Sequence, residues 1–174
     1  TQSPELMQLQ HIDKKIYRSH LKRVILLVII SMLVIALSIS TLLIEVIGKP
    51  EVSNFLLNLF GVIFAVAVVI SVVYKNRLHP YMNEILYVWR LKQELNAIYR
   101  QSAKLKPAVD AKDHNALIIQ YFNLKGSIQL YELDDNDLTL SDLKADLQAL
   151  ELELQLVGLV PDAGIYRRAL FDVL

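Results

Sequence analysis

Two long runs of apolar residues dominate the hydrophobic pattern of the first 75 residues. Residues 24–44 contain 21 consecutive uncharged side chains and residues 55–74 contain 20. A helix of about 20 residues crosses a hydrocarbon core of roughly 30 Å. A chain of 174 residues has too little polar sequence to cover two such helices in a soluble core. We therefore expect two transmembrane helices, 24–47 and 55–74, joined as an antiparallel hairpin.

Basic residues are distributed unevenly around these runs. The connecting segment holds only Lys49, whereas seven basic residues flank the runs on their other sides: Lys14, Lys15, Arg18, Lys22, Arg23, Lys75 and Arg77. By the positive-inside rule, both termini are expected on the cytoplasmic side, with these seven side chains at anionic lipid headgroups. The first run is too long for a signal peptide, and no small-residue cleavage site closes it.

The ends of the two helices also carry recognisable signals. Gly48 and Pro50 are expected to end the first helix, and Ser53 or Asn54 to cap the second. Before the first span, residues 1–23 form a basic lead-in. Its second half has helical spacing and is expected either to lie at the headgroup level as an amphipathic helix or to extend the first span.

Polar and small residues recur within both runs. Ser31, Ser38 and Glu45 stand at seven-residue steps, with Thr41 beside them, so they share one helical face. In the second run a shared face holds Asn58, Gly61 and Ala65, the last two forming a small-x-x-x-small pair that permits close helix approach. Two interpretations follow: these faces pack, within the hairpin or between protomers, or they line a conduction path.

Beyond residue 75 the apolar positions follow three- and four-residue steps, which predicts helices at about 81–104, 113–131, 140–157 and 162–171. We expect Asp110 or Asp113 to cap the second of these, and Thr139 with Asp142 to open the third as a capping box. Because single helices of this length are marginally stable in water, their apolar seams must meet one another or a partner. The seam residues are Val88, Leu91, Leu95, Ile98, Leu117, Tyr121, Leu124, Ile128, Leu143, Leu147, Leu150 and Leu154.

The expected fold is therefore all-α: a transmembrane helical hairpin over residues 24–74, followed by a cytoplasmic antiparallel helical bundle over residues 75–174. Composition agrees, since 54% hydrophobic residues and a mean hydropathy of +0.38 are high for a soluble domain. The net charge of zero hides a gradient: residues 75–106 carry seven basic and two acidic residues, and residues 107–174 carry five basic and twelve acidic ones. The basic part suits anionic headgroups, although the two parts could equally neutralise each other by packing.

Residues 79–98, with the sequence HPYMNEILYVWRLKQELNAI, resemble the most recognisable block of a small bacterial family of two-span inner-membrane proteins. The stretch Gly126-Ser127-x-Gln129-Leu130, running into residues 133–139, is similar to the same family, as is the order of the elements. The family is known only as a domain of unknown function. The resemblance implies the cytoplasmic membrane of a Gram-negative bacterium, and it implies no activity, cofactor or catalytic residue.

Motifs for chemistry are missing from the sequence. It contains no phosphate-binding glycine loop, nucleophile elbow or zinc-protease signature, and no cysteine. The acidic cluster at residues 134–137 lacks the glycine and glutamate that a calcium-binding loop needs. The four histidines lack ligand-like spacing, and the basic residues are too sparse for a nucleic-acid surface. We therefore expect no cofactor, no metal and no nucleic acid. The expected function is non-enzymatic, in assembly as a homo-oligomer or accessory subunit; the alternative is an oligomeric channel or transport component.

Overall fold

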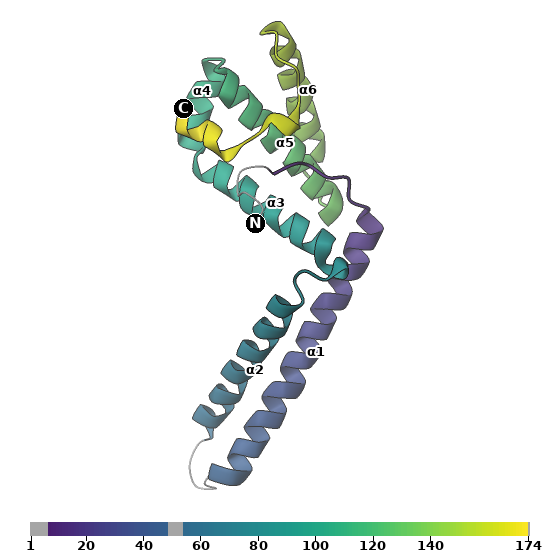
Figure 1. Cartoon of the computed structure of the whole chain (residues 1–174), viewed down its shortest axis with the longest axis vertical. Coiled ribbons are helices and arrows are strands. Elements are labelled where there is room, and N and C mark those ends of the chain that lie inside the picture. The colour runs from purple at the N-terminus through teal and green to yellow at the C-terminus, as the bar shows by residue number, and fades with distance from the viewer. Residues whose placement is uncertain (1–6, 49–53, 174) are drawn as a thin grey trace. The chain divides into compact units, whose positions relative to one another are not determined.

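The computed structural model describes residues 7–48 and 54–173 (Figure 1). These residues form six α-helices and three short 3₁₀ helices and contain no strand. They divide into two compact units, a hairpin unit, Lys15–Leu86, and a helical unit made of the residues before Lys15 together with those from Tyr87 onward. The all-α class expected from the sequence is confirmed: two long apolar helices are followed by a helical region.

The hairpin unit consists mainly of α1 (Lys14–Ile47) and α2 (Phe55–Lys75), which lie side by side (Figure 1). α1 begins ten residues before the expected span, and the basic lead-in continues into the span as one helix. The absence of glycine and proline over residues 14–47 explains this continuity. Of the two interpretations of the lead-in, the structure therefore favours an extension of the first span over a separate helix.

The ends of the two long helices match the expected bounds closely. Gly48 directly follows the last residue of α1, and its amide donates a hydrogen bond to the Ile44 carbonyl at 2.9 Å. Asn54 occupies the N-cap position of α2 but forms no side-chain capping bond. Pro50 and Ser53, which the sequence also proposed as end signals, lie outside the described residues, as does Lys49.

The predicted helix 81–104 is divided in the structure. A 3₁₀ turn (Pro80–Met82) leads into α3 (Asn83–Arg100), and after Gln101 the chain continues as α4 (Ser102–Asp110). The predicted end at about residue 104 thus falls inside α4, which also contains Pro107. Because proline has no N–H, the carbonyl of Ala103 receives no helical hydrogen bond from position 107.

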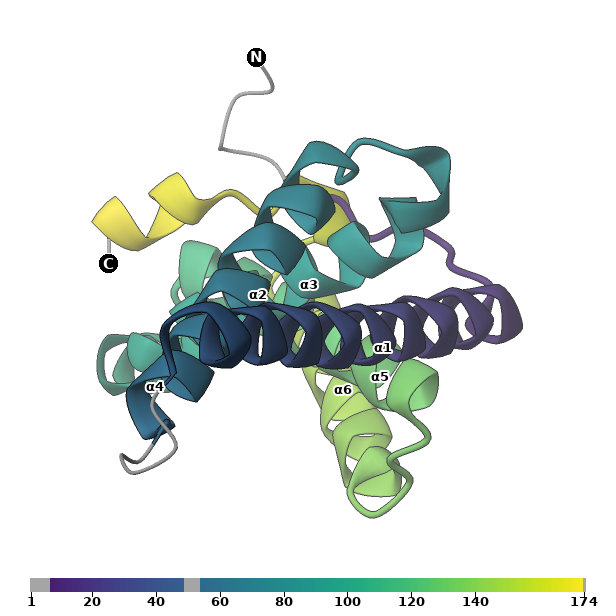
Figure 2. The same cartoon turned by 90° about the horizontal axis from the view of Figure 1, so that it is seen from below.

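α5 (His114–Asp134) is the central helix of the helical unit, and α6 (Leu140–Leu156) lies beside it (Figures 1 and 2). The Asp113 carboxylate caps α5 by accepting hydrogen bonds from the amides of Asn115 and Ala116, at 2.8 and 2.9 Å. Thr139 stands at the N-cap of α6 but forms no side-chain bond there, so the predicted capping box is wrong.

The expected helix 162–171 is replaced by two short 3₁₀ segments, Ala163–Ile165 and Arg168–Val173. Asp162 does act as a cap, because its carboxylate accepts a hydrogen bond from the Gly164 amide at 2.8 Å. Tyr166 then has a ψ of 132°, which ends helical geometry and directs its ring against Phe122, with ring centroids 4.0 Å apart. The last segment therefore covers α5 by an aromatic stack rather than by a helical stripe.

The predicted seams form the core of the helical unit. Ten of the twelve seam residues are buried. The other two, Leu143 and Leu147, are partly buried against the cluster formed by Leu117, Tyr121, Leu124, Leu150 and Leu154. The seams thus meet one another within the chain and are not available to a partner. Gly126 on α5 contributes to this packing, since a Cβ there would lie only 3.1 Å from Leu95 and 3.2 Å from Leu91.

Candidate interaction surfaces

α1 and α2 approach each other closely at the small-x-x-x-small pair. Gly61 and Ala65 are both buried. A Cβ on Gly61 would overlap the Ser40 hydroxyl and lie 3.0 Å from the Ser40 amide nitrogen and 3.1 Å from the Ala36 carbonyl oxygen. The Ser40 hydroxyl in turn donates a hydrogen bond to the Asn58 carbonyl at 3.4 Å. The partner of Gly61 on α1 is therefore Ser40, which the sequence analysis did not select.

The hairpin contact follows four-residue steps along both helices. On α2 it runs through Gly61, Ala65 and Val69, and on α1 through Ala36 and Ser40. Four residues advance a helical line by about 40°, whereas seven residues set it back by about 20°. The two lines therefore turn in opposite directions around the helix. Side chains spaced seven residues apart, such as Ser31, Ser38 and Glu45, leave the contact with α2 within two seven-residue repeats.

The polar residues selected from the first run lie largely outside this contact. Ser38, Thr41 and Glu45 are exposed on α1, Asn58 is exposed on α2, and Ser31 faces the space between the helices. The prediction that this polar face meets Gly61 and Ala65 within one hairpin is therefore wrong, because the contact line rotates away from the seven-residue line. Contact between protomers stays a prediction.

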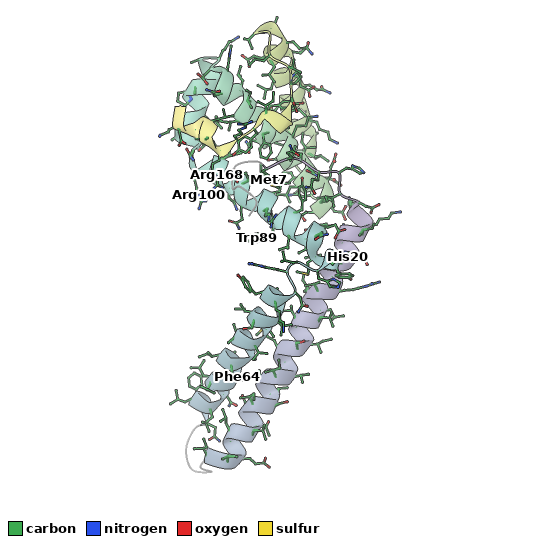
Figure 3. The ribbon with its side chains drawn as sticks, in the orientation of Figure 1. Met7, His20, Phe64, Trp89, Arg100 and Arg168 are labelled. Carbon is green, nitrogen blue, oxygen red and sulfur yellow. The ribbon has the colours of Figure 1, made fainter. Side chains whose placement is uncertain are left out.

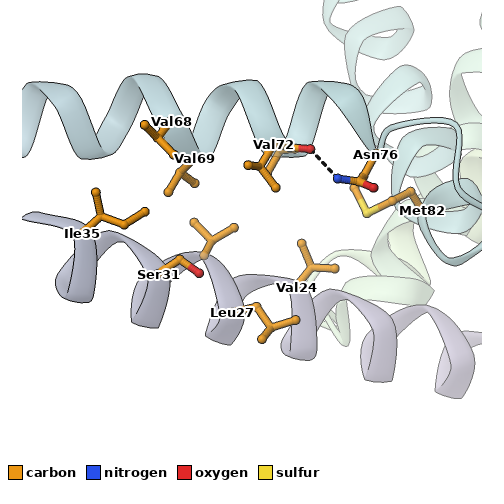
Figure 4. A pocket seen from close by; sticks show the side chains of 11 residues that line it. Val24, Leu27, Ser31, Ile35, Val68, Val69, Val72, Asn76 and Met82 are labelled. Carbon is orange, nitrogen blue, oxygen red and sulfur yellow. Dashed lines mark hydrogen bonds between the residues drawn. The ribbon is translucent and has the colours of Figure 1, made fainter.

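Toward residues 24–35, α1 and α2 leave an apolar groove of about 230 Å³ (Figure 4). Valines from both helices form most of its wall, and Ser31 and Asn76 are its polar side chains. Asn76 is already engaged, since its side-chain amide donates to the Val72 carbonyl at 2.8 Å. The groove therefore offers apolar surface and one serine hydroxyl, with no charged group.

A cluster of polar side chains joins α1 to the first turn of α3 within the hairpin unit. The His20 ring stacks on Tyr81 with centroids 3.7 Å apart, and its Nδ1 lies 3.2 Å from a carboxylate oxygen of Glu84. His79 accepts a hydrogen bond from the Tyr81 amide at 3.2 Å. These contacts hold the beginning of α3 beside His20 of α1. His20 lies one helical turn before residue 24, where the apolar run of α1 begins.

The basic residues predicted to lie at headgroups have different surroundings. Lys14 forms an ion pair with Asp135, and both residues belong to the helical unit. The Arg77 guanidinium lies over the Tyr74 ring, 3.9 Å from its centroid. Arg18 is partly buried, and the remaining four side chains are exposed: Lys15, Lys22, Arg23 and Lys75.

A closed ring of hydrogen bonds holds the N-terminal segment on the helical unit. The Gln10 amide donates to the Tyr87 hydroxyl at 2.9 Å, this hydroxyl donates to the Gln129 side-chain oxygen at 2.9 Å, and the Gln129 amide donates back to the Gln10 carbonyl. Burial raises the pKa of Tyr87. This ring was not predictable from the sequence, because its three members are far apart along the chain.

A second cluster fastens the C-terminal segment to α3. The Glu94 carboxylate accepts one hydrogen bond from the Tyr166 hydroxyl at 2.7 Å and two from the Arg168 guanidinium, at 3.2 and 2.7 Å. Burial, followed by the hydrogen bond to Glu94, raises the pKa of Tyr166, and the same carboxylate raises the pKa of Arg168. These three hydrogen bonds hold the C-terminal segment on α3, and those from the charged guanidinium are the stronger kind.

The acidic cluster after α5 is likewise engaged in local structure. Asp135 adopts a left-handed conformation, with a φ of 56°, and ends α5. Asp134 forms an ion pair with Lys92 at 2.9 Å, and Asp135 pairs with Lys14. Within residues 7–48 and 54–173, no group of three or more histidine, aspartate or glutamate side chains is arranged to hold a metal ion.

α6 carries a second apolar stripe, on the side opposite its packed seam. Ala145, Ala149, Leu152 and Leu156 follow one another at steps of four, three and four residues, and all four are exposed. Leu152 is 64% exposed and Leu156 84% exposed. We call these four residues the outer face of α6. This face was not predicted from the sequence, although it has the same three- and four-residue spacing as the inner seam.

Comparisons with known proteins place the chain in a family. No curated protein and no protein of known structure matches it significantly. The family model described as "Protein of unknown function (DUF3087)" matches residues 7–171, which covers both the apolar hairpin and the helical unit. The resemblance found in the sequence is thereby confirmed at the level of a domain of unknown function. The chain belongs to the DUF3087 family of proteins of unknown function.

Proposed function

We propose that this chain is a non-enzymatic, two-span protein of the bacterial inner membrane, with both termini cytoplasmic, and that its helical unit mediates assembly. The exposure of α1 and α2 supports the membrane part. In the most apolar stretch of 18 residues, only 6% of the α1 residues and 17% of the α2 residues are buried inside the protein. Apolar helices of a soluble core would be covered, and helices this exposed are stable in lipid.

The outer face of α6 is the single observation that supports assembly. Exposed single leucines are ordinary, but a continuous stripe along about three helical turns is typical of an interaction surface. The inner seam of the same helix is already packed against α5. α6 is thus apolar on two opposite sides, and only one of them is used within the chain.

The order of small and large residues along this face fits a second copy of the same helix. Antiparallel pairing about a two-fold axis between residues 150 and 151 places Leu156 opposite Ala145 of the second copy, and Leu152 opposite Ala149. Each large side chain then meets a small one, as a self-complementary interface requires. An accessory-subunit role would use the same face against a helix of another inner-membrane protein.

The test compares the full-length protein with variants in mild detergent, by multi-angle light scattering and by identification of co-purifying polypeptides. We expect the wild type to be a dimer or to retain a partner, and the double variant Leu152→Gln/Leu156→Gln to lose it while its circular dichroism spectrum is unchanged. Leu138→Gln is the matched control, because Leu138 is 91% exposed but lies outside α6. A wild-type protein that is strictly monomeric and retains no partner would contradict assembly.

An oligomeric channel is the second candidate, and the exposed position of Ser38, Thr41 and Glu45 favours it. Polar side chains on the lipid-facing side of a span are unfavourable unless they face another protomer or water. An oligomer with this side of α1 turned inward satisfies them. Ion flux into proteoliposomes tests this role: if a measured conductance is the same in Ser38→Leu/Glu45→Leu, these residues do not line the path.

A further inference from the structure

The exposed side of α3 combines basic and aromatic residues. Trp89 is 58% exposed and Tyr99 77% exposed, and both Arg90 and Arg100 are exposed. Trp89 and Arg100 project from the side of α3 that the core of the helical unit leaves uncovered (Figure 3). We call these four residues the basic-aromatic face.

No acidic side chain of α3 compensates for this positive charge. The helix contains two acidic residues, and both are engaged elsewhere: Glu84 with His20, and Glu94 with Tyr166 and Arg168. The one lysine of α3, Lys92, is paired with Asp134. The packing of the protein therefore removes the negative charges of α3 from its exposed side and leaves both arginines there.

We propose that the basic-aromatic face binds an anionic bilayer surface. Arginine attracts acidic headgroups, and tryptophan and tyrosine favour the boundary between water and lipid. The position in the chain suits this partner, because only seven residues separate the end of α2 from the start of α3. His20 and Glu84 also hold the first turn of α3 beside the part of α1 that precedes its apolar run. This inference rests on the proposed membrane insertion of α1 and α2.

Trp89 is the only tryptophan of the chain, so its fluorescence reports on this face directly. The full-length protein is placed in nanodiscs of phosphatidylcholine, with and without phosphatidylglycerol, and with brominated acyl chains as quencher. We expect a blue-shifted, quenched Trp89 signal in the anionic discs and recovery of the signal in high salt, which screens headgroup attraction. Removing one arginine in Arg100→Gln should weaken docking about five-fold, the usual contribution of one basic residue near an anionic surface.

Arg167→Gln is the matched control, since Arg167 is an exposed arginine outside α3, and it should leave the Trp89 signal unchanged. A Trp89 signal that is the same in neutral and anionic discs would overturn the inference. The inference would also be overturned if the blue shift of Trp89 depended on protein concentration and not on lipid charge. The basic-aromatic face would then bind protein and not the bilayer. If the protein elutes without lipid, membrane insertion itself fails, and the inference fails with it.

Discussion

Replacing Gly61 with alanine should weaken the packing of α1 against α2. The new Cβ would overlap the Ser40 hydroxyl, which could move away only by losing its hydrogen bond to the Asn58 carbonyl. It would also lie 3.0 Å from the Ser40 amide nitrogen and 3.1 Å from the Ala36 carbonyl oxygen. Ordinary contact begins at about 3.5 Å, so the two helices must separate by roughly 0.5 Å along this line. Overpacking of this kind costs about 1–3 kcal/mol.

The intrinsic preference of helices for alanine acts in the opposite direction, by about 0.5–1 kcal/mol. A double-mutant cycle separates the two effects, because the preference is the same in every background. In a Ser40→Ala background the overlap with the hydroxyl is gone and only the backbone contacts remain. We therefore expect the alanine at position 61 to be better tolerated there, with a coupling energy of at least 0.5 kcal/mol.

The assay is reversible unfolding of the full-length protein in mixed micelles by titration with a denaturing detergent, followed by circular dichroism. Ser38→Ala is the matched control for Ser40→Ala, since Ser38 is an exposed serine two residues away. Its cycle with Gly61→Ala should show no coupling. Equal effects of Gly61→Ala in the wild-type and Ser40→Ala backgrounds would refute the close contact that the structure assigns to these residues.

Two further predictions concern the helical unit. Glu94→Gln should lower the free energy of unfolding by about 1–3 kcal/mol, because the Glu94 side chain is only 14% exposed and binds three donors. Glu132→Gln, which removes a half-exposed ion pair, should cost at most about 1 kcal/mol in the same denaturant titration. Burial, with the nearby Glu151 carboxylate, raises the pKa of Tyr121 to about 12. The folded state therefore holds this proton more tightly than the unfolded state, so its stabilising effect is complete below pH 10 and is lost as the pH rises toward 12. Stability measured from pH 8 to 11.5 should thus fall more steeply for the wild type than for Tyr121→Phe, and parallel curves would contradict this account.

The fold was largely predictable because its strongest signals are local. Uninterrupted apolar runs predicted α1 and α2, and three- and four-residue steps predicted the apolar sides of α3, α5 and α6. The boundaries were less predictable where the chain changes direction. Nothing in the spacing indicates the break at Gln101, or the continuation of the chain as a helix from Ser102 to Asp110, beyond the predicted end at about residue 104. The extended backbone at Tyr166 depends on a stack with Phe122, which is 44 positions away in the sequence.

The interaction surfaces were predicted only in part, for a geometrical reason. The pair Gly61 and Ala65 was recognisable because its four-residue step coincides with the line along which the helices touch. Its partner Ser40 was not recognisable, because it lies outside the seven-residue line of Ser31, Ser38 and Glu45 on α1. The apolar seams were located correctly as residues, but helical spacing alone does not tell whether a seam meets its own chain or another. The positive charge on the exposed side of α3 was not predictable either. It depends on the pairing of Glu94 with Tyr166 and Arg168, which lie more than 70 positions away in the sequence.

The central claim is that α1 and α2 cross the inner membrane with the helical unit inside the cell. The chain contains no cysteine, so single cysteines can be placed at Ile47, an exposed residue at the end of α1, and at the exposed Leu138 of the helical unit. In intact spheroplasts, a membrane-impermeant maleimide should label the cysteine at position 47, and it should label the one at position 138 only after lysis. Labelling at position 138 in intact spheroplasts, or recovery of the protein in the soluble fraction, would contradict the account.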